Sequence, residues 1–196
     1  MATWRDGILK ARTDAAPDCR RLLDALYADQ PLGAPTGTYA VAGFDDGDDQ
    51  AQLRHQVLSL RPADVDRTLA WLRTLPKTCA RFTATTPGAG KQDVQVSELA
   101  LPALGDARQG LRITFTAPPG TSEDADDPDG DGDGDGPDGG TAPALTLDVA
   151  AVRVGGDAFA LTDGAPGDLA SDAAVAAARR GADRLTAVQH GARVQA

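Results

Sequence analysis

The sequence predicts a single α+β domain in which an antiparallel β-sheet is flanked by about three helices and carries a long acidic Asp/Gly loop. Helical periodicity occurs in three separate segments, and strand-like alternation fills the stretches between them. Short turns join consecutive strand candidates, which is typical of an antiparallel sheet. We expect the helices to pack on one face of this sheet.

The length of 196 residues fits one domain. We expect the domain to span residues 17–190, between a flexible N-terminal segment at 1–16 and a tail at 191–196. Its first helix is predicted in APDCRRLLDALYAD, where leucines recur at helical spacing after the start signal Pro17-Asp18. The stretch QPLGAPTG ends that helix.

Two strands are predicted next, TYAVAGF at 38–44 and AQLRHQVLSL at 51–60, joined by the turn DDGDDQ. The second strand alternates and places Leu53, His55 and Val57 on one side.

The clearest helical pattern is PADVDRTLAWLRTL, residues 62–75. Val65, Leu69 and Leu72 form one apolar stripe along it. We expect Pro76 to end this helix.

The remainder is predicted as about five strands and a final helix. The strand candidates are ARFTATT, DVQVSELAL, GLRITFTA, PALTLDVAAVRVG and DAFALT. The helix is DLASDAAVAAARRGADRLTAVQ, which Gly181 should weaken slightly. Its apolar side consists of Val175, Ala178, Ala182, Leu185 and Val188.

An acidic run accounts for most of the net charge of −10. Without its nine Asp and Glu residues the chain would carry a net charge of −1. With no basic stripe to contact a phosphate backbone, we expect no nucleic-acid partner. No run of 18 apolar residues exists, so no transmembrane segment is predicted.

The acidic run has two interpretations. We expect residues 118–143 to be a disordered, solvated insertion, because high charge and few apolar side chains cannot offset the entropy of ordering. The alternative is a weak Ca²⁺ site, since the spacing of six carboxylates fits an EF-hand loop with Gly132 at its sixth position. The helices that should flank such a loop are missing from the sequence. The candidate ligands are Asp127, Asp129, Asp131, Asp133, Asp135 and Asp138.

Cys19 and Cys79 are the two cysteines of the chain. A disulfide between them would close a loop of about 60 residues and stabilise the fold by roughly 4 kcal/mol. The spacing equally allows two unconnected buried cysteines in a cytosolic protein.

No catalytic signature is visible. His55 and His190 lie outside any recognisable triad, and no G-x-S-x-G motif is present. GAGK at 88–91 lacks the spacing of a phosphate-binding loop and is expected to be a turn between strands. We predict no catalytic residues and no cofactor other than the weak Ca²⁺ described above.

Several motifs together resemble the PknH-like extracellular sensor domain family of actinobacterial surface proteins and lipoproteins, over roughly residues 17–189. They are PDC at 17–19, LRHQVLSLRPADVDRTLAWLRTLPKTCARF at 53–82, QDVQVSELALPALGD, and the closing strand and helix, DVAAVRVGGDAFALTDG followed by AAVAAARRGADRL. The resemblance implies an exported, surface-tethered domain with disulfides and a groove for an unidentified ligand. It favours a Cys19–Cys79 bridge, because export brings oxidising conditions.

Two departures limit the resemblance. Kinase members of that family usually carry two disulfides, whereas this chain has two cysteines, and no kinase domain or membrane segment is present here. We therefore expect a non-enzymatic, extracytoplasmic ligand-binding domain of a secreted protein or lipoprotein. Its partner would be a small molecule or a cell-envelope component. Trp71 and Tyr39 are candidate ligand contacts, although a Trp in a helix stripe is more often part of the core.

Three alternatives remain open. The first is a hydrolase that gathers His55 with an acid and a nucleophile, and the second is a calcium-dependent interaction module built on the acidic run. No leader is visible at the N-terminus, so a cytoplasmic location is the third if Met1 is the native start.

Overall fold

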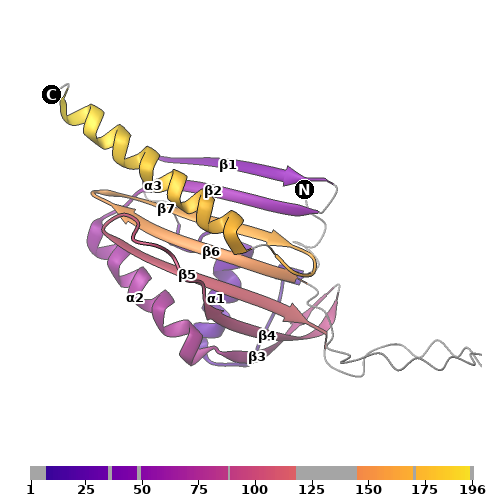
Figure 1. The fold of residues 1–196 in the computed structure, drawn as a ribbon. Coiled ribbons are helices and arrows are strands. Elements are labelled where there is room, and N and C mark those ends of the chain that lie inside the picture. Colours follow the sequence, from indigo (N-terminus) through magenta and orange to yellow (C-terminus); the bar gives the residue numbers. More distant parts are fainter. Residues whose placement is uncertain are drawn as a thin grey trace, which may run out of the picture.

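The computed structural model describes residues 8–34, 37–47, 50–87, 89–117, 145–169 and 171–194. Within these residues, seven strands form one antiparallel sheet with three helices, as the sequence predicts (Figure 1). The helices are α1 (Pro17–Tyr27), α2 (Pro62–Thr78) and α3 (Ser171–Val194). The strands are β1 (Tyr39–Asp46), β2 (Ala51–Ser59), β3 (Arg81–Thr86), β4 (Gly90–Glu98), β5 (Ala107–Thr116), β6 (Leu145–Val154) and β7 (Asp157–Ala165).

The strand order across the sheet is β1-β2-β7-β6-β5-β4-β3. The chain builds a hairpin at one edge, crosses a face of the sheet as α2, and builds the remaining strands inward from the opposite edge (Figure 1). β7 then closes the sheet by pairing with β2, for example Phe159 with Val57.

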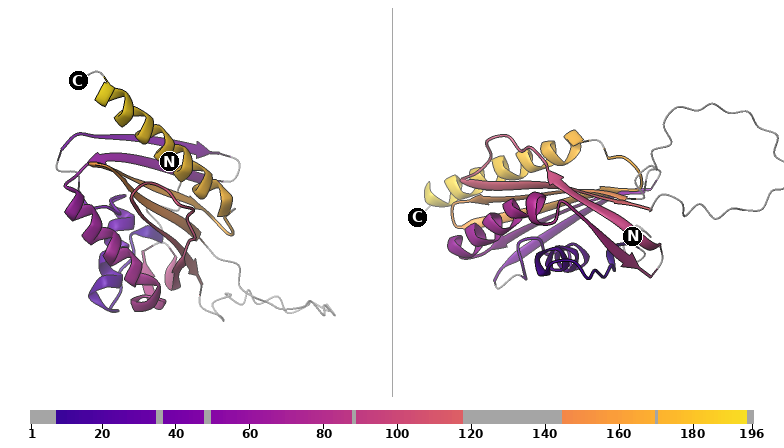
Figure 2. Two further views of the ribbon diagram at one scale, coloured as in Figure 1. Left: turned by 60° about the vertical axis from the view of Figure 1, so that its left-hand side comes forward. Right: turned by 90° about the horizontal axis from the view of Figure 1, so that it is seen from below.

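The helices cover both faces of the sheet, and the expectation that they share one face is wrong. α1 and α2 lie below the sheet and α3 lies above it in the right-hand view of Figure 2. The cause lies in β6, which is apolar on both sides. Leu147 and Val149 pack toward α1 and α2, whereas Ala150 and Val152 belong to the cluster that includes α3.

The two apolar clusters differ in the size of their side chains. The cluster under α1 and α2 is built largely from Leu, Val, Ile and Phe. α3 contributes alanines to the second cluster, Ala174, Ala178 and Ala182, which bring its backbone close to the sheet. Each of these alanines buries less apolar area than a leucine would, and Val175 and Leu185 add partly buried contacts.

Pro76 does not end the second long helix, contrary to our prediction. α2 continues through it to Thr78, and the N–H of Cys79 still donates to the carbonyl of Leu75 at 2.8 Å. Because Pro76 lies in the last turn, its missing N–H removes one hydrogen bond at the end of the ladder rather than in the middle.

Residues 8–16 of the expected flexible segment at 1–16 pack on the domain, and residues 1–7 lie outside the described part of the chain. Ile8 and Leu9 are buried in the core, and Arg12 forms a β-bridge with Thr85 at the edge of β3. At the other end, α3 extends to Val194, into the expected tail at 191–196.

The acidic insertion at 118–143 lies outside the described residues. The strands on either side of it are paired, with Phe115 of β5 opposite Leu145 of β6. None of the described helices is long and apolar enough to cross a membrane.

Candidate functional site

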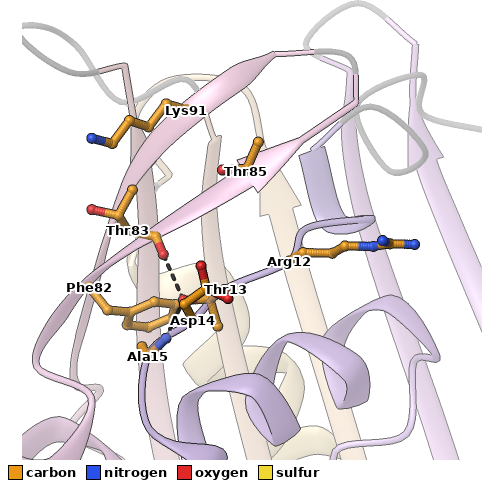
Figure 3. Close-up of a pocket in the computed structure, with 8 residues that line it drawn as sticks. All are labelled: Arg12, Thr13, Asp14, Ala15, Phe82, Thr83, Thr85 and Lys91. Carbon is orange, nitrogen blue, oxygen red and sulfur yellow. Dashed lines mark hydrogen bonds between the residues drawn. The ribbon is translucent and has the colours of Figure 1, made fainter.

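An open groove of ≈ 650 Å³ runs beside the edge strand β3 (Figure 3). One wall is the segment before α1, and the other is the β3–β4 hairpin. Its lining residues are Arg12, Thr13, Asp14, Ala15, Phe82, Thr83, Thr85 and Lys91.

Backbone pairing at the edge of β3 sets the shape of this groove. The N–H of Arg12 donates to the carbonyl of Thr85 at 2.9 Å, and the N–H of Thr85 donates back to Arg12 at 2.8 Å. The Thr13 hydroxyl donates to the carbonyl of Thr83 at 2.7 Å and accepts the N–H of Ala15 at 3.1 Å. The short segment therefore lies along β3 as a fixed wall.

The groove carries two cations and one carboxylate. Arg12 and Lys91 are exposed, and within the described part of the chain neither side chain has an ion-pair partner. Figure 3 shows the two cationic side chains extending away from each other, with Thr85 between them. This spacing suits a ligand with separated anionic or hydrogen-bonding groups, because each cation keeps its own side of the groove.

A second, smaller pocket of ≈ 340 Å³ lies near the start of β5. It is lined by two arginines, but both already have partners. Arg73 donates to the Gln109 side chain at 3.4 Å, and Arg108 donates to the carbonyl of Leu101 at 3.4 Å. Glu98 and Asp106 balance the two positive charges, so the β3 groove is the stronger candidate.

Cys19 and Cys79 are joined by a disulfide, with their Cα atoms 5.5 Å apart. The bridge connects the first turn of α1 to the residue that follows α2. Both cysteines are buried, so the bridge belongs to the core and does not line the groove.

Trp71 and Tyr39, the two predicted ligand contacts, do not line the groove. The Trp71 indole N–H donates to Asp18 at 3.0 Å, and the Arg21 guanidinium lies 3.8 Å from the ring centroid. Trp71 therefore helps to hold α1 against α2. Tyr39 lies on the edge strand β1 and is 59% exposed.

Neither histidine is near the groove. His55 stacks on Phe159 with ring centroids 4.9 Å apart, and burial lowers its pKa. His190 is exposed on α3. Of the GAGK stretch, expected as a turn between strands, Ala89 lies in the turn between β3 and β4, whereas Gly90 and Lys91 begin β4. Lys91 also lines the groove, a role that the sequence motif does not indicate.

The six candidate calcium ligands, Asp127 to Asp138, fall outside the described residues, so the structure does not test them. In the part of the chain that is described, no group of three or more His, Cys, Asp or Glu side chains is placed to hold a metal ion.

A buried charged row crosses the α3 face of the sheet, and the sequence analysis missed it. Arg112, Asp148 and Asp163 lie directly opposite one another on β5, β6 and β7. Arg112 donates to both carboxylate oxygens of Asp148 at 2.7 Å. Burial, followed by the charge of Asp148, raises the pKa of Asp163 to about 6, against a hydrogen bond from the Gly164 backbone.

Two signals in the sequence could have revealed this row. Arg112 and Asp148 each lie between two apolar residues of a predicted strand. Their neighbours are Leu111 and Ile113 for the arginine and Leu147 and Val149 for the aspartate. Such a position implies a partner, because an unpaired charge is seldom buried.

Comparison of the sequence with protein-family models and with curated proteins finds no match. The resemblance to the PknH-like extracellular domain family therefore stays a prediction.

Proposed function

We propose that this protein is a non-enzymatic, sensor-like ligand-binding domain that works outside the cytoplasm and binds a small anionic ligand. The observation that carries the proposal is the β3 groove, an open site lined by Arg12 and Lys91, two exposed cations without an ion-pair partner among the described residues. The Thr85 side chain between the cations adds a hydroxyl group to the site. Carboxylate and phosphate groups are the anions that such donors recognise.

The location outside the cytoplasm is supported by the Cys19–Cys79 disulfide. Structural disulfides persist in oxidising compartments and are rare in the cytosol. The resemblance to exported sensor domains agrees with this location, and the ligand is then a small molecule or a component of the cell envelope.

A non-enzymatic role is favoured by the position of the histidines. The hydrolase alternative needs His55 beside an acid and a nucleophile in an accessible pocket, but His55 lies under α3 and does not line either pocket described above.

Binding of simple anions tests the groove. We expect inorganic phosphate or citrate to shift the amide NMR signals of residues 12–15 and 83–91 in the full chain. Arg12→Gln and Lys91→Gln should each weaken this binding by about tenfold, because each removes one charge-assisted contact of about 1.5 kcal/mol.

Matched controls are Arg20→Gln on α1 and Lys77→Gln on α2, two exposed cations outside the groove. The affinity of these two variants for phosphate or citrate should equal that of the unmodified protein. Equal weakening in all four variants would indicate a general charge effect and contradict the assignment of the groove. Amide NMR shifts confined to residues outside 12–15 and 83–91 would also contradict this assignment.

Intact-mass measurement tests the location. In protein from an exporting host, both cysteines should resist alkylation until they are reduced. Free labelling of the unfolded, unreduced protein would contradict the extracytoplasmic proposal and favour the cytoplasmic alternative.

A further inference from the structure

Asp163 is a buried carboxyl group with an unsatisfied oxygen. Its exposed fraction is 5%, and its Oδ2 atom has no hydrogen-bond partner among the described residues. It lies on the α3 face near the end of β7, shortly before the chain turns into α3 (Figure 1). An unpaired buried carboxylate is costly, so this residue calls for an explanation.

The neighbours of Asp163 increase this cost. Asp148 lies directly opposite on β6, and its carboxylate is already engaged by Arg112. When all three groups are ionised, the row holds one positive and two negative charges. Like charges directly opposite each other on adjacent strands destabilise a sheet.

Among the described residues, the other elements around Asp163 bring no compensating cation. On β2 the residue opposite is Leu53, and the next titratable group on that face is His55, whose neutral form is favoured by burial. The connection to α3 and its first turn carry Asp168 and Asp172, which are acidic as well. A proton is the simplest group that can neutralise this site.

Arg112 of this row and Thr146, beside it on β6, both contact the connection that leads into α3. Arg112 also donates to the carbonyl of Leu169 at 3.3 Å, and the Thr146 hydroxyl donates to the carbonyl of Gly167 at 2.6 Å. These two contacts hold the connection that leads into α3. Beyond it, the helix is packed on the sheet mainly through alanines.

We propose that Asp163 is a proton switch that controls how firmly α3 is docked on the sheet. In its protonated form the side chain donates its O–H to the Asp148 carboxylate, which keeps lone pairs free beside Arg112. In its ionised form it repels Asp148 and weakens the contacts that hold the start of α3.

The pKa of Asp163 supports this direction of response. It is raised from 3.8 to about 6 in the folded protein, so the folded state binds the proton more tightly than the unfolded state. The contribution of Asp163 to the free energy of unfolding is therefore fully favourable below pH 3.8 and is lost as the pH rises through about 6. Docking of α3 should weaken over that window.

His55, on the same face of the sheet, changes the stability of the protein with pH in the opposite direction to Asp163. Burial lowers its pKa below 6.5, so its contribution is present above pH 6.5 and is lost as the pH falls through the folded-state value. The two titrations overlap, and the stability of the unmodified protein alone would not separate them. The test therefore compares variants at each pH.

The experiment measures thermal stability and amide hydrogen exchange of the full chain between pH 4 and 7.5, in the unmodified protein and in Asp163→Asn. Asn mimics the neutral carboxyl group in size. We expect the melting temperature of Asp163→Asn to equal that of the unmodified protein near pH 4. As the pH rises from 4 to 7, the melting temperature of the variant should exceed that of the unmodified protein by a growing margin. Exchange in the first turns of α3 should then be slower in the variant, by about tenfold for each unit by which the pKa is raised.

The matched control is Asp24→Asn on the exposed side of α1, whose stability should follow that of the unmodified protein at every pH. Parallel curves for Asp163→Asn and the unmodified protein would overturn the proposal. If the variant fails to fold, the Asp163 carboxyl carbon is titrated by NMR in the unmodified protein. A midpoint near 6 supports the switch, and one near 3.8 overturns it.

Discussion

Gly181 shows how one residue fixes the distance between α3 and the sheet. A Cβ atom at this position would lie 2.6 Å from Nε2 of His55 and 3.3 Å from the Phe159 ring. Both rings are stacked on each other, so neither can move away freely. The helix therefore tolerates a residue of low helical propensity because only glycine fits against these rings.

We expect Gly181→Ala to destabilise the protein by about 1–3 kcal/mol, as overpacking does in other cores. Gly191→Ala is the matched control on the same helix. A Cβ there meets nothing within 4 Å, so helical propensity should make that change neutral or slightly stabilising. Urea unfolding of both variants measures the difference. A stabilising Gly181→Ala would mean that α3 does not rest on His55.

At the scale of elements, α1 and α2 form a unit held by the Cys19–Cys79 bridge and by Trp71. The bridge spans a sequence separation of 60 residues. Replacing both cysteines by Ser should lower the free energy of unfolding by about 4 kcal/mol on the chain-entropy model. Guanidinium unfolding measures the loss, and reduction of the unmodified protein should reproduce it. Equal stability of the bridged and reduced forms would contradict this role.

The sequence predicts the elements well because apolar periodicity is a local property. β2 was expected at 51–60 and occupies Ala51–Ser59, and each of the other expected strands overlaps an observed one. The side of the sheet that each helix covers depends on long-range packing, which periodicity does not report. The apolar run of β6 indicated burial on both faces, and we did not draw that conclusion.

The candidate site was harder to predict than the fold. Arg12 and Lys91 line the same groove because Arg12 forms a β-bridge with Thr85, a residue more than 70 positions later in the chain. Neither cation belongs to a recognisable motif. Asp163 likewise acquires its unusual environment from Asp148 and Arg112, which lie on other strands.

At the scale of the whole molecule, the acidic insertion should be dispensable for folding. β5 and β6 are adjacent and antiparallel, so a connection of about 2–5 residues is sufficient to join them. We expect a variant that replaces residues 118–143 with a short Gly-containing turn to keep its melting temperature within a few degrees. Loss of folding in this variant would assign a structural role to the insertion.

The same deletion variant tests the calcium alternative. If the six candidate carboxylates bind Ca²⁺ only weakly or not at all, 1 mM Ca²⁺ should leave the melting temperature of the full chain unchanged. A rise in the full chain that is absent from the deletion variant would favour the calcium-dependent interaction module. An equal rise in both would place the ion elsewhere.

The strand order has a consequence for the order in which the sheet can form during synthesis. β2 pairs with β7, and Val57 of β2 lies opposite Phe159, about 100 residues later in the chain. The edge of β2 that faces β7 therefore stays uncovered until β7 has been synthesised. As the chain emerges, the β1–β2 hairpin therefore remains an open template to which other strands could add.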